Sequence, residues 1–385
     1  MLKINFKQLL FSSVTLFSIG VLAACSSGSG TTKTLASKTD NQSLTTSASN
    51  TNVASGVGSI DWSALPTKEV TLSNEGLTIT EGGTYVVTGT TTAGITVETD
   101  ANVRLILAGA TISDSDNAAI NVLKADNVEI NLKDGTTNMV KDTDQHFDAE
   151  IEGAIHVEAD LFITGNGNLT VEGNFQDGIV STDDMVISSG NITVTAVDDG
   201  IRGKDSLTIN GGVLNVTAGG DAIKSTNDED VTKGYTTITG GDITVKAGDD
   251  GIKAESTLTI EGGTIKVSES VEALEATAIT INGGILDVYA SDDAINSSSS
   301  VVGADVFIKV TGGDLTVAVG SGDTDAFDAN GNLYISGGNI TVTAPTSAFD
   351  FDGIVEFTGG TVTVNGEKVT EIVHTGPGAG GPRGW

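Results

Sequence analysis

The stretch Leu207-Thr-Ile-Asn-Gly-Gly-Val-Leu-Asn-Val216 decides the fold, because nearly the same ten residues return along the chain. Two further copies are Leu258-Thr-Ile-Glu-Gly-Gly-Thr-Ile-Lys-Val267 and Leu333-Tyr-Ile-Ser-Gly-Gly-Asn-Ile-Thr-Val342. Apolar residues alternate with other residues on both sides of the glycine pair, which is the period of a β-strand. The glycines stand where a turn must separate two short strands, because glycine accepts backbone angles that other residues avoid. Each copy therefore predicts two strands joined by a turn.

The spacing of the copies indicates how they stack. The first glycine of the pair, or its equivalent, falls at positions 189, 211, 240, 262, 283, 312, 337 and 359, so most steps are 21 or 22 residues. Three short strands and three turns fit into such a step, which makes one coil of a parallel β-helix. A propeller blade needs about 40 residues and an immunoglobulin-like domain about 100, so neither fits. With weaker copies upstream, we predict an all-β, single-stranded parallel β-helix of about twelve coils.

The two ends of the chain differ from the repeat in composition. Lys3 and Lys7 precede a short apolar stretch that ends in Leu22-Ala-Ala-Cys25, which is typical of a bacterial lipoprotein signal. We expect the lipid on Cys25 to anchor an exported protein to the cell envelope or surface. The chain then divides into a signal peptide (1–24), a flexible Ser/Thr-rich tether (25–58), the β-helix (59–370) and a Gly/Pro-rich tail (371–385).

The net charge of −32 restricts the partners of this surface. We expect no nucleic acid, because so acidic a surface does not neutralise phosphates. Divalent cations, or partners reached through them, match the charge better. Cys25 is the only cysteine and there are three histidines, which argues against zinc or copper.

A second motif, Asp-Gly-Ile or a close variant, precedes each strand pair. In stacked coils it places a carboxylate at one position on successive strands, about 4.8 Å apart. Like charges at that separation repel by about 1 kcal/mol even in water, so the column needs an offset. Calcium is the simplest offset, since it binds several oxygens in flexible geometry; a turn preference of Asp without any ion is the alternative. The column consists of Asp177, Asp199, Asp221, Asp250, Glu272, Asp293 and Asp325.

A second column follows three residues later, with Arg202, Lys224 and Lys253 in the central coils. These bases are either ion-pair partners of the first column or contacts for an anionic ligand. Glu275, Asn296 and Asp328 replace them further along, so the later coils are the best calcium positions. The candidate calcium ligands are Asp199, Asp221, Asp250, Glu272, Glu275, Asp292, Asp293, Asp323, Asp325, Asp328, Asp350 and Asp352.

Three coils are longer than the others and predict loops. The extra residues are 141–150, which are very acidic, 225–235 and 297–305. Repeat proteins place such insertions on one face. If the three loops share one flank, they wall a groove along the helix.

The motifs together resemble those of a known family. Asp198-Asp-Gly-Ile201, the glycine-pair repeat, Glu272-Ala-Leu-Glu-Ala276 and Ala348-Phe-Asp-Phe-Asp-Gly353 are similar to motifs of bacterial surface proteins described as carbohydrate-binding. The resemblance covers about residues 75–365. It implies a right-handed parallel β-helix similar to pectate lyases, with bound calcium and affinity for cellulose or acidic sugars such as polygalacturonate. The chain departs from the family at Glu272-Ala-Leu, where Gly-Ile is usual, and at Gly153, which takes the column position before Asp177.

These observations favour a calcium-dependent surface lipoprotein that binds an acidic or cellulosic polysaccharide, and not an enzyme. Candidate ligand contacts are the three bases together with Tyr289 and Tyr334, which strand parity points outward. A calcium-dependent polysaccharide lyase is the alternative, with Lys224, Lys253 or Arg202 as its base. Ion pairing with Asp argues against it, because the pair keeps a lysine charged. A surface adhesin or scaffold without glycan specificity is the second alternative.

Overall fold

The structure is a computed structural model that describes residues 60–322 and 324–376. The predicted signal peptide, tether and lipidated Cys25, together with Asp323, lie outside the described residues. Helical structure within them is limited to the 3-10 turn η1 (Trp62–Ala64), and no described helix has the length and apolar character needed to cross a membrane. The rest of the regular structure is strand.

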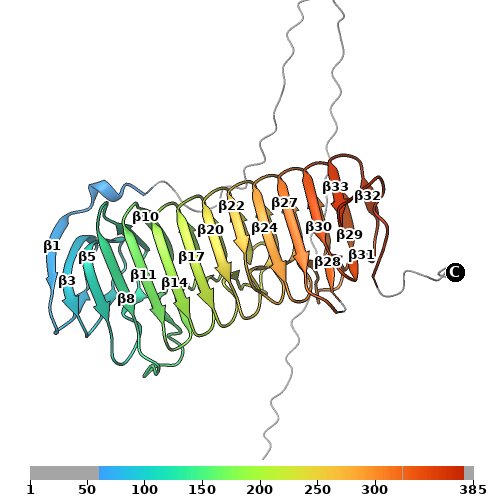
Figure 1. Cartoon of the computed structure of the whole chain (residues 1–385). Helices are drawn as coiled ribbons and strands as arrows, with labels where there is room; N and C mark the ends of the chain where they lie inside the picture. The colour runs from blue at the N-terminus through green and yellow to red at the C-terminus, as the bar shows by residue number, and fades with distance from the viewer. Residues whose placement is uncertain (1–59, 323, 377–385) are drawn as a thin grey trace, which may run out of the picture. The chain divides into compact units, whose positions relative to one another are not determined.

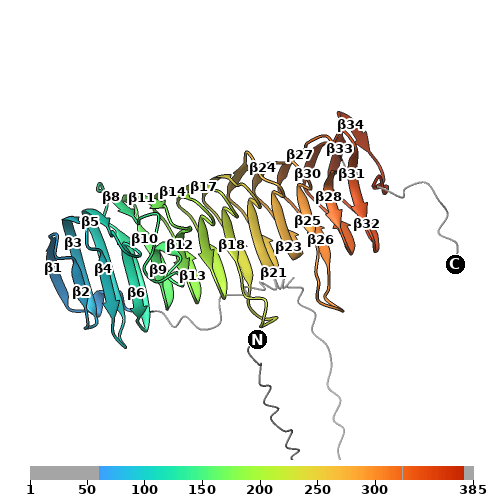
Figure 2. The same cartoon turned by 90° about the horizontal axis from the view of Figure 1, so that it is seen from below.

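The strands form the predicted parallel β-helix, in which three sheets run side by side along one axis (Figure 1, Figure 2). We call sheet 1 the strands before each glycine pair, sheet 2 those after it, and sheet 3 those that follow the Asp column.

Sheet 1 contains β1 (Thr67–Leu72), β3 (Gly83–Thr91), β5 (Val103–Ser113), β7 (Asn127–Leu132), β10 (Asp160–Gly165), β13 (Asp184–Ile187), β16 (Ser206–Ile209), β19 (Tyr235–Ile238), β21 (Ile252–Ile260), β23 (Leu274–Ile281), β26 (Phe307–Val310), β29 (Asn332–Ile335) and β32 (Val355–Phe357).

Sheet 2 contains the ends of β3 and β5, then β8 (Thr137–Lys141), β11 (Asn168–Gly173), β14 (Asn191–Ala196), β17 (Val213–Ala218), β20 (Asp242–Lys246), β22 (Thr264–Val267), β24 (Ile285–Ala290), β27 (Asp314–Val319), β30 (Asn339–Thr343) and β33 (Thr361–Val364), with β34 (Glu367–Val369) antiparallel to β33.

Sheet 3 has twelve strands, which confirms the predicted number of coils: β2 (Leu77–Ile79), β4 (Ile95–Glu98), β6 (Ile120–Lys124), β9 (Gly153–Val157), β12 (Asp177–Ser181), β15 (Ile201–Gly203), β18 (Ile223–Ser225), the first residues of β21 and β23, β25 (Ile295–Ser297), β28 (Asp325–Ala329) and β31 (Ser347–Phe351).

The core is a set of ladders of identical apolar side chains. Ile201, Ile223 and Ile252 pair in register on successive coils of sheet 3, and all three are completely buried. Burying each such side chain stabilises the fold by about 1.5–3 kcal/mol. Because the inward residues repeat at every coil, the register of the outward residues is fixed as well.

The glycine pairs form the turns between sheets 1 and 2, as predicted. The second glycine of each pair has positive φ, for example +105° at Gly241 and +96° at Gly263. A Cβ on Gly263 would lie 3.0 Å from the carbonyl oxygen of Gly241 in the preceding coil. The pair therefore allows the coils to stack closely at this corner.

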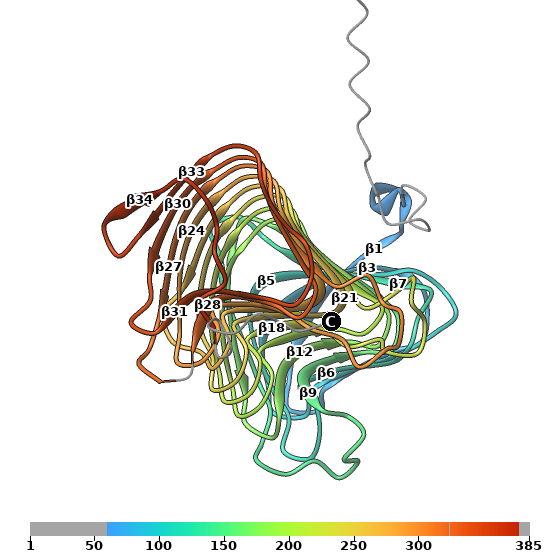
Figure 3. The same ribbon diagram turned by 90° about the vertical axis from the view of Figure 1, so that its right-hand side faces the viewer.

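The three longer loops do not share one flank. The loop of residues 142–152 joins β8 of sheet 2 to β9 of sheet 3, and Figure 3 shows it projecting beyond β9. The loops of residues 226–234 and 298–306 instead join sheet 3 to sheet 1. Sheet 3 therefore has insertions at both of its edges, so the predicted single wall does not form.

Candidate functional site

The predicted carboxylate column lies at the start of the sheet 3 strands. Register pairs Ile179 with Ile201 and Ile201 with Ile223, so the aspartates two residues before them, Asp177, Asp199 and Asp221, occupy one position on successive coils. Gly153 stands opposite Asp177 at the start of the column, as the sequence predicts.

The central carboxylates are buried, and each binds the backbone of the next coil. The N–H of Asp199 donates to Asp177 Oδ1 (3.0 Å), that of Asp221 to Asp199 Oδ1 (3.0 Å), and that of Asp250 to Asp221 Oδ1 (2.9 Å). The C-terminal coils repeat the bond between the Asp325 N–H and Asp293 Oδ1 (2.7 Å). One oxygen of each acceptor thus replaces a backbone acceptor between coils, which gives the column a structural role.

The basic residues offset the charge of the second carboxylate oxygen. Lys224 Nζ lies 2.7 Å from Asp199 Oδ2 and 2.9 Å from Asp221 Oδ2, so that it joins two coils. Lys253 pairs with Asp250 (2.8 Å) and with Glu275 of the next coil. The basic residues were expected to be either ion-pair partners of the carboxylates or contacts for an anionic ligand, and these distances favour ion pairing.

Arg202 also pairs across coils, and one of its partners is a residue that the sequence analysis missed. Its guanidinium lies 2.8 Å from Asp177 and also binds Glu152, fifty residues earlier in the chain. Glu152 directly precedes Gly153 and so takes the same place as Asp198 and Asp249, the first acid of each Asp-Asp motif. This alignment could have identified Glu152 from the sequence.

The pairing keeps the bases protonated. Burial lowers the pKa of Lys224, but the hydrogen bond to Asp199 and the charge of Asp221 raise it above its usual value overall. The same balance raises the pKa of Lys253 and of Arg202. A general base must lose its proton near neutral pH, so these three residues are poor candidates for the base of a lyase.

Negative charge is in excess where the basic residues end. Lys253 is a single cation between Asp250 and Glu275, and burial together with the neighbouring Glu275 raises the pKa of Asp250 to about 8. Burial also raises the pKa of Glu272 to about 7. Beyond them it raises the pKa of Asp293 to about 6 and that of Asp328 to about 7. These groups are therefore stabilised by a proton or by a cation.

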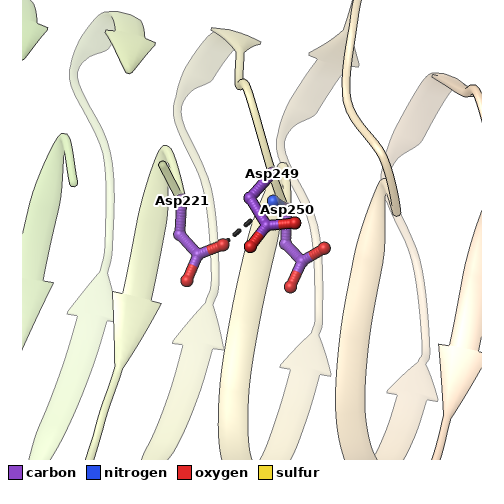
Figure 4. A group of neighbouring side chains, drawn as sticks. All are labelled: Asp221, Asp249 and Asp250. Atoms are coloured by element: carbon purple, nitrogen blue, oxygen red, sulfur yellow. Dashed lines mark hydrogen bonds between the residues drawn. The ribbon is translucent and has the colours of Figure 1, made fainter. Parts of the chain in front are cut away.

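Among the described residues, two groups of three carboxylates have ligand oxygens within 4.8 Å of one another. One consists of Asp221, Asp249 and Asp250, of which Asp249 is exposed (Figure 4). The other consists of Asp250, Glu272 and Glu275. Its Glu272 Oε2 is buried without a hydrogen-bond partner, and its all-oxygen donor set suits calcium. The second group therefore fits such an ion better, although Lys253 already binds two of its members.

The other predicted ligands are not gathered in the same way. Asp292 and Asp352 are exposed, and Asp350 binds His374 Nε2 from the C-terminal segment. Within the described ranges, Asp293, Asp325 and Asp328 stack near one another but form no third group with oxygens inside 4.8 Å.

The predicted ligand contacts lie on three different faces. Arg202, Lys224 and Lys253 belong to sheet 3, whereas Tyr289 is on β24 of sheet 2 and Tyr334 on β29 of sheet 1. Tyr289 is 42% exposed and points outward as strand parity predicts. The two tyrosines do not form a common platform, because they belong to separate sheets.

This chain is similar to known proteins. A family model described as "Carbohydrate-binding domain-containing protein" matches residues 73–326. A relative from Acetivibrio thermocellus with the same description is 33% identical over 135 residues, which are 33% of this chain and 47% of the relative, so the chain spans about half of that relative's length. The solved structure of a polysaccharide lyase-like protein from C. thermocellum, a gadolinium derivative, is 33% identical with a TM-score of 0.53, and the match covers 57% of this chain and 95% of the other.

Proposed function

The chain belongs to the family of carbohydrate-binding domain-containing proteins, and from this membership we propose that it is a calcium-dependent surface lipoprotein that binds an acidic or cellulosic polysaccharide. The described β-helix carries the binding face. The lipid on Cys25 holds it at the cell envelope, as the Leu22-Ala-Ala-Cys25 motif suggests.

One observation supports the calcium dependence. Asp250, Glu272 and Glu275 lie close together beside Lys253, the last of the three basic residues on sheet 3. Their oxygens lie within 4.8 Å, one of them is buried without a partner, and a single lysine supplies the positive charge that contacts them. A bound calcium offers further coordination positions for outside oxygens. The carboxylates of polygalacturonate are such oxygens, which makes an acidic glycan the better match of the two.

The test is retention of the protein on polygalacturonate and on cellulose, with calcium or with a chelator. We expect retention on polygalacturonate in calcium and its loss with chelator. Glu272→Gln should weaken retention at least tenfold, whereas Glu261→Gln, at an exposed turn of the same region, should leave it unchanged. Retention that survives the chelator contradicts the calcium proposal. Failure to bind either polymer contradicts the glycan proposal and leaves an adhesin or scaffold.

The same incubation distinguishes binding from cleavage. A lyase releases unsaturated uronates, which absorb in the ultraviolet, and their accumulation would establish the enzymatic alternative. The protonated state of Lys224, Lys253 and Arg202 leads us to expect none.

A further inference from the structure

The loop of residues 142–152 is tied to the preceding coil by its backbone. The N–H of Phe147 donates to the carbonyl of Asp116 (2.6 Å), and that of Asp148 to Asn117 Oδ1 (3.3 Å). The loop thus reaches back across the edge of sheet 3 toward the turn that leads into β6. Phe147 itself is 92% exposed, so packing of its own side chain does not hold the loop in place.

His146 fastens the loop from inside. Its side chain is buried and stacks on Phe175 with ring centroids 4.4 Å apart. Nε2 lies 3.1 Å from Asp142 Oδ2, and Nδ1 contacts the carbonyl oxygen of Ile151. A carboxylate and a carbonyl only accept hydrogen bonds, so both ring nitrogens must donate, which requires the imidazolium form.

The charges around His146 favour that form. Asp142 on the loop and Asp114 on the turn after β5 face it, and His156 on β9 opposes its charge. The segment that carries Phe175, residues 173–176, has no charged side chain. Burial lowers the pKa of His146, but its hydrogen bonds to Asp142 and Ile151 raise it above the ordinary 6.5 overall.

A row of unsatisfied polar side chains lies on sheet 3 beside this loop. Asn121 and His156 pair in register, and Val180 separates His156 from Arg202. Asn121 is 8% exposed and His156 is 3% exposed. Asn121 Oδ1, His156 Nδ1 and Arg202 Nε are buried without hydrogen-bond partners. Buried polar atoms without partners are costly, so such a row indicates a polar occupant.

The loop itself supplies the carboxylate that Arg202 binds. Glu152, its last residue, pairs with the guanidinium. Burial and the charge of Arg202 lower the pKa of His156 to about 4, so that a neutral imidazole, able to donate and to accept, stands next to the pair. A sugar with a carboxylate for Arg202 and hydroxyls for His156 and Asn121 matches these groups. At about 4.8 Å per coil the row spans about 14 Å, more than one sugar unit.

We propose that residues 142–152 form a lid, fastened by the protonated His146, over a uronate subsite made of Asn121, His156 and Arg202. The uronate carboxylate replaces Glu152 on Arg202 when the lid opens. The pH dependence of lid closure follows from His146. Because its pKa is raised in the folded protein, the protonated side chain stabilises the closed lid at low pH, and this stabilisation is lost as the pH rises above that pKa. The subsite rests on the proposed glycan-binding function, whereas the lid does not.

Hydrogen exchange of the full chain at pH 6 and pH 8.5, corrected for intrinsic rates, tests the lid. We expect protection of residues 142–152 to fall severalfold at the higher pH, because the two hydrogen bonds of His146 need its imidazolium form. Residues 226–234, an insertion without histidine, serve as the internal control and should not change. His146→Gln should abolish protection at both pH values, and Asp142→Asn should move the loss to lower pH. Equal protection of the loop in wild type at both pH values, or wild-type protection in His146→Gln, overturns the lid.

Calorimetric titration with trigalacturonate in calcium tests the subsite. We expect His146→Gln to bind severalfold more tightly than wild-type protein at pH 6, and the two proteins to bind alike at pH 8.5. Adding Asn121→Ala and His156→Ala to His146→Gln should remove this gain, while Asn215→Ala, at an exposed position of β17 in sheet 2, should not. If the polymer is retained but these variants bind alike, the subsite is wrong and the proposed function stands. If no glycan binds at any pH, both are wrong.

Discussion

The central and the C-terminal coils of sheet 3 have the same backbone and different electrostatics. In the centre, Asp199 and Asp221 bind both the next coil's N–H and the ammonium of Lys224. Further along, Glu275 and Asp328 stand where the lysines were, and the pKa of Asp328 rises to about 7 through burial and the charge of Asp293. The comparison shows that the column binds the backbone of the next coil in both regions, whereas a base accompanies it only in the centre. Where the base is missing, we propose that a cation offsets the charge of the column.

Removing a central carboxylate should have the largest effect. Asp221→Ala leaves the Asp250 N–H without its acceptor and Lys224 with one partner, so we expect a loss of about 3–5 kcal/mol in denaturant unfolding. Asp221→Asn keeps an acceptor and should lose less. Asp249→Ala, at the exposed neighbouring carboxylate, should change stability by no more than about 0.5 kcal/mol. An equal effect of the Asp249 and Asp221 variants would contradict the ladder.

Lys253→Met converts a central coil into an acidic one. It leaves Asp250 and Glu275 facing each other, and we expect a loss of about 3 kcal/mol at pH 7 in chelator. Calcium should restore part of this loss. Lys266→Met is the control. It removes an exposed ion pair in which Lys266 Nζ lies 3.6 Å from Asp287 Oδ2, and it should hardly change the free energy of unfolding. A variant that calcium does not stabilise more than wild type argues against cation binding at this position.

Calcium should stabilise the wild-type protein by binding to Asp250, Glu272 and Glu275. At a hundred times its dissociation constant, a ligand that binds only the folded state adds about 2.7 kcal/mol. Thermal unfolding with calcium and with chelator measures this shift, and Glu272→Gln should remove most of it, since Glu272 supplies the unpartnered oxygen. Asp352→Asn, an exposed carboxylate, should retain the shift. Identical melting curves with and without calcium contradict the site.

The register of the coils could be predicted because the chain repeats it. Once the Ile ladder is aligned, Lys224 lies three residues after Asp221 in the same coil, and the structure shows their ion pair. The partner of Arg202 could not be predicted in this way, because the guanidinium reaches past Val180 to Glu152, two coils away. Strand parity showed that Tyr289 points outward. Strand parity does not tell which of the three sheets a tyrosine belongs to. It therefore could not show that Tyr289 and Tyr334 lie on separate faces.

The smallest expected effect is the pH dependence of the acidic coils without calcium. Burial raises the pKa of Asp328 from 3.8 to about 7 and that of Glu272 from 4.5 to about 7. A raised carboxyl pKa means that the folded state holds a proton that the unfolded state releases, so stability is greatest below pH 4 for these groups and falls as the pH rises to about 7. We expect a loss of about 1 kcal/mol per group, reduced by their partial exposure, and Asp328→Asn should remove its share.

Calcium should flatten or reverse the slope, since it favours the ionised carboxylates. Unfolding curves in chelator between pH 5 and pH 8 measure this, with Asp292→Asn as the exposed control. If stability in chelator rises over this range in wild type and in Asp328→Asn alike, the C-terminal carboxylates already have partners, and the contrast with the central coils disappears.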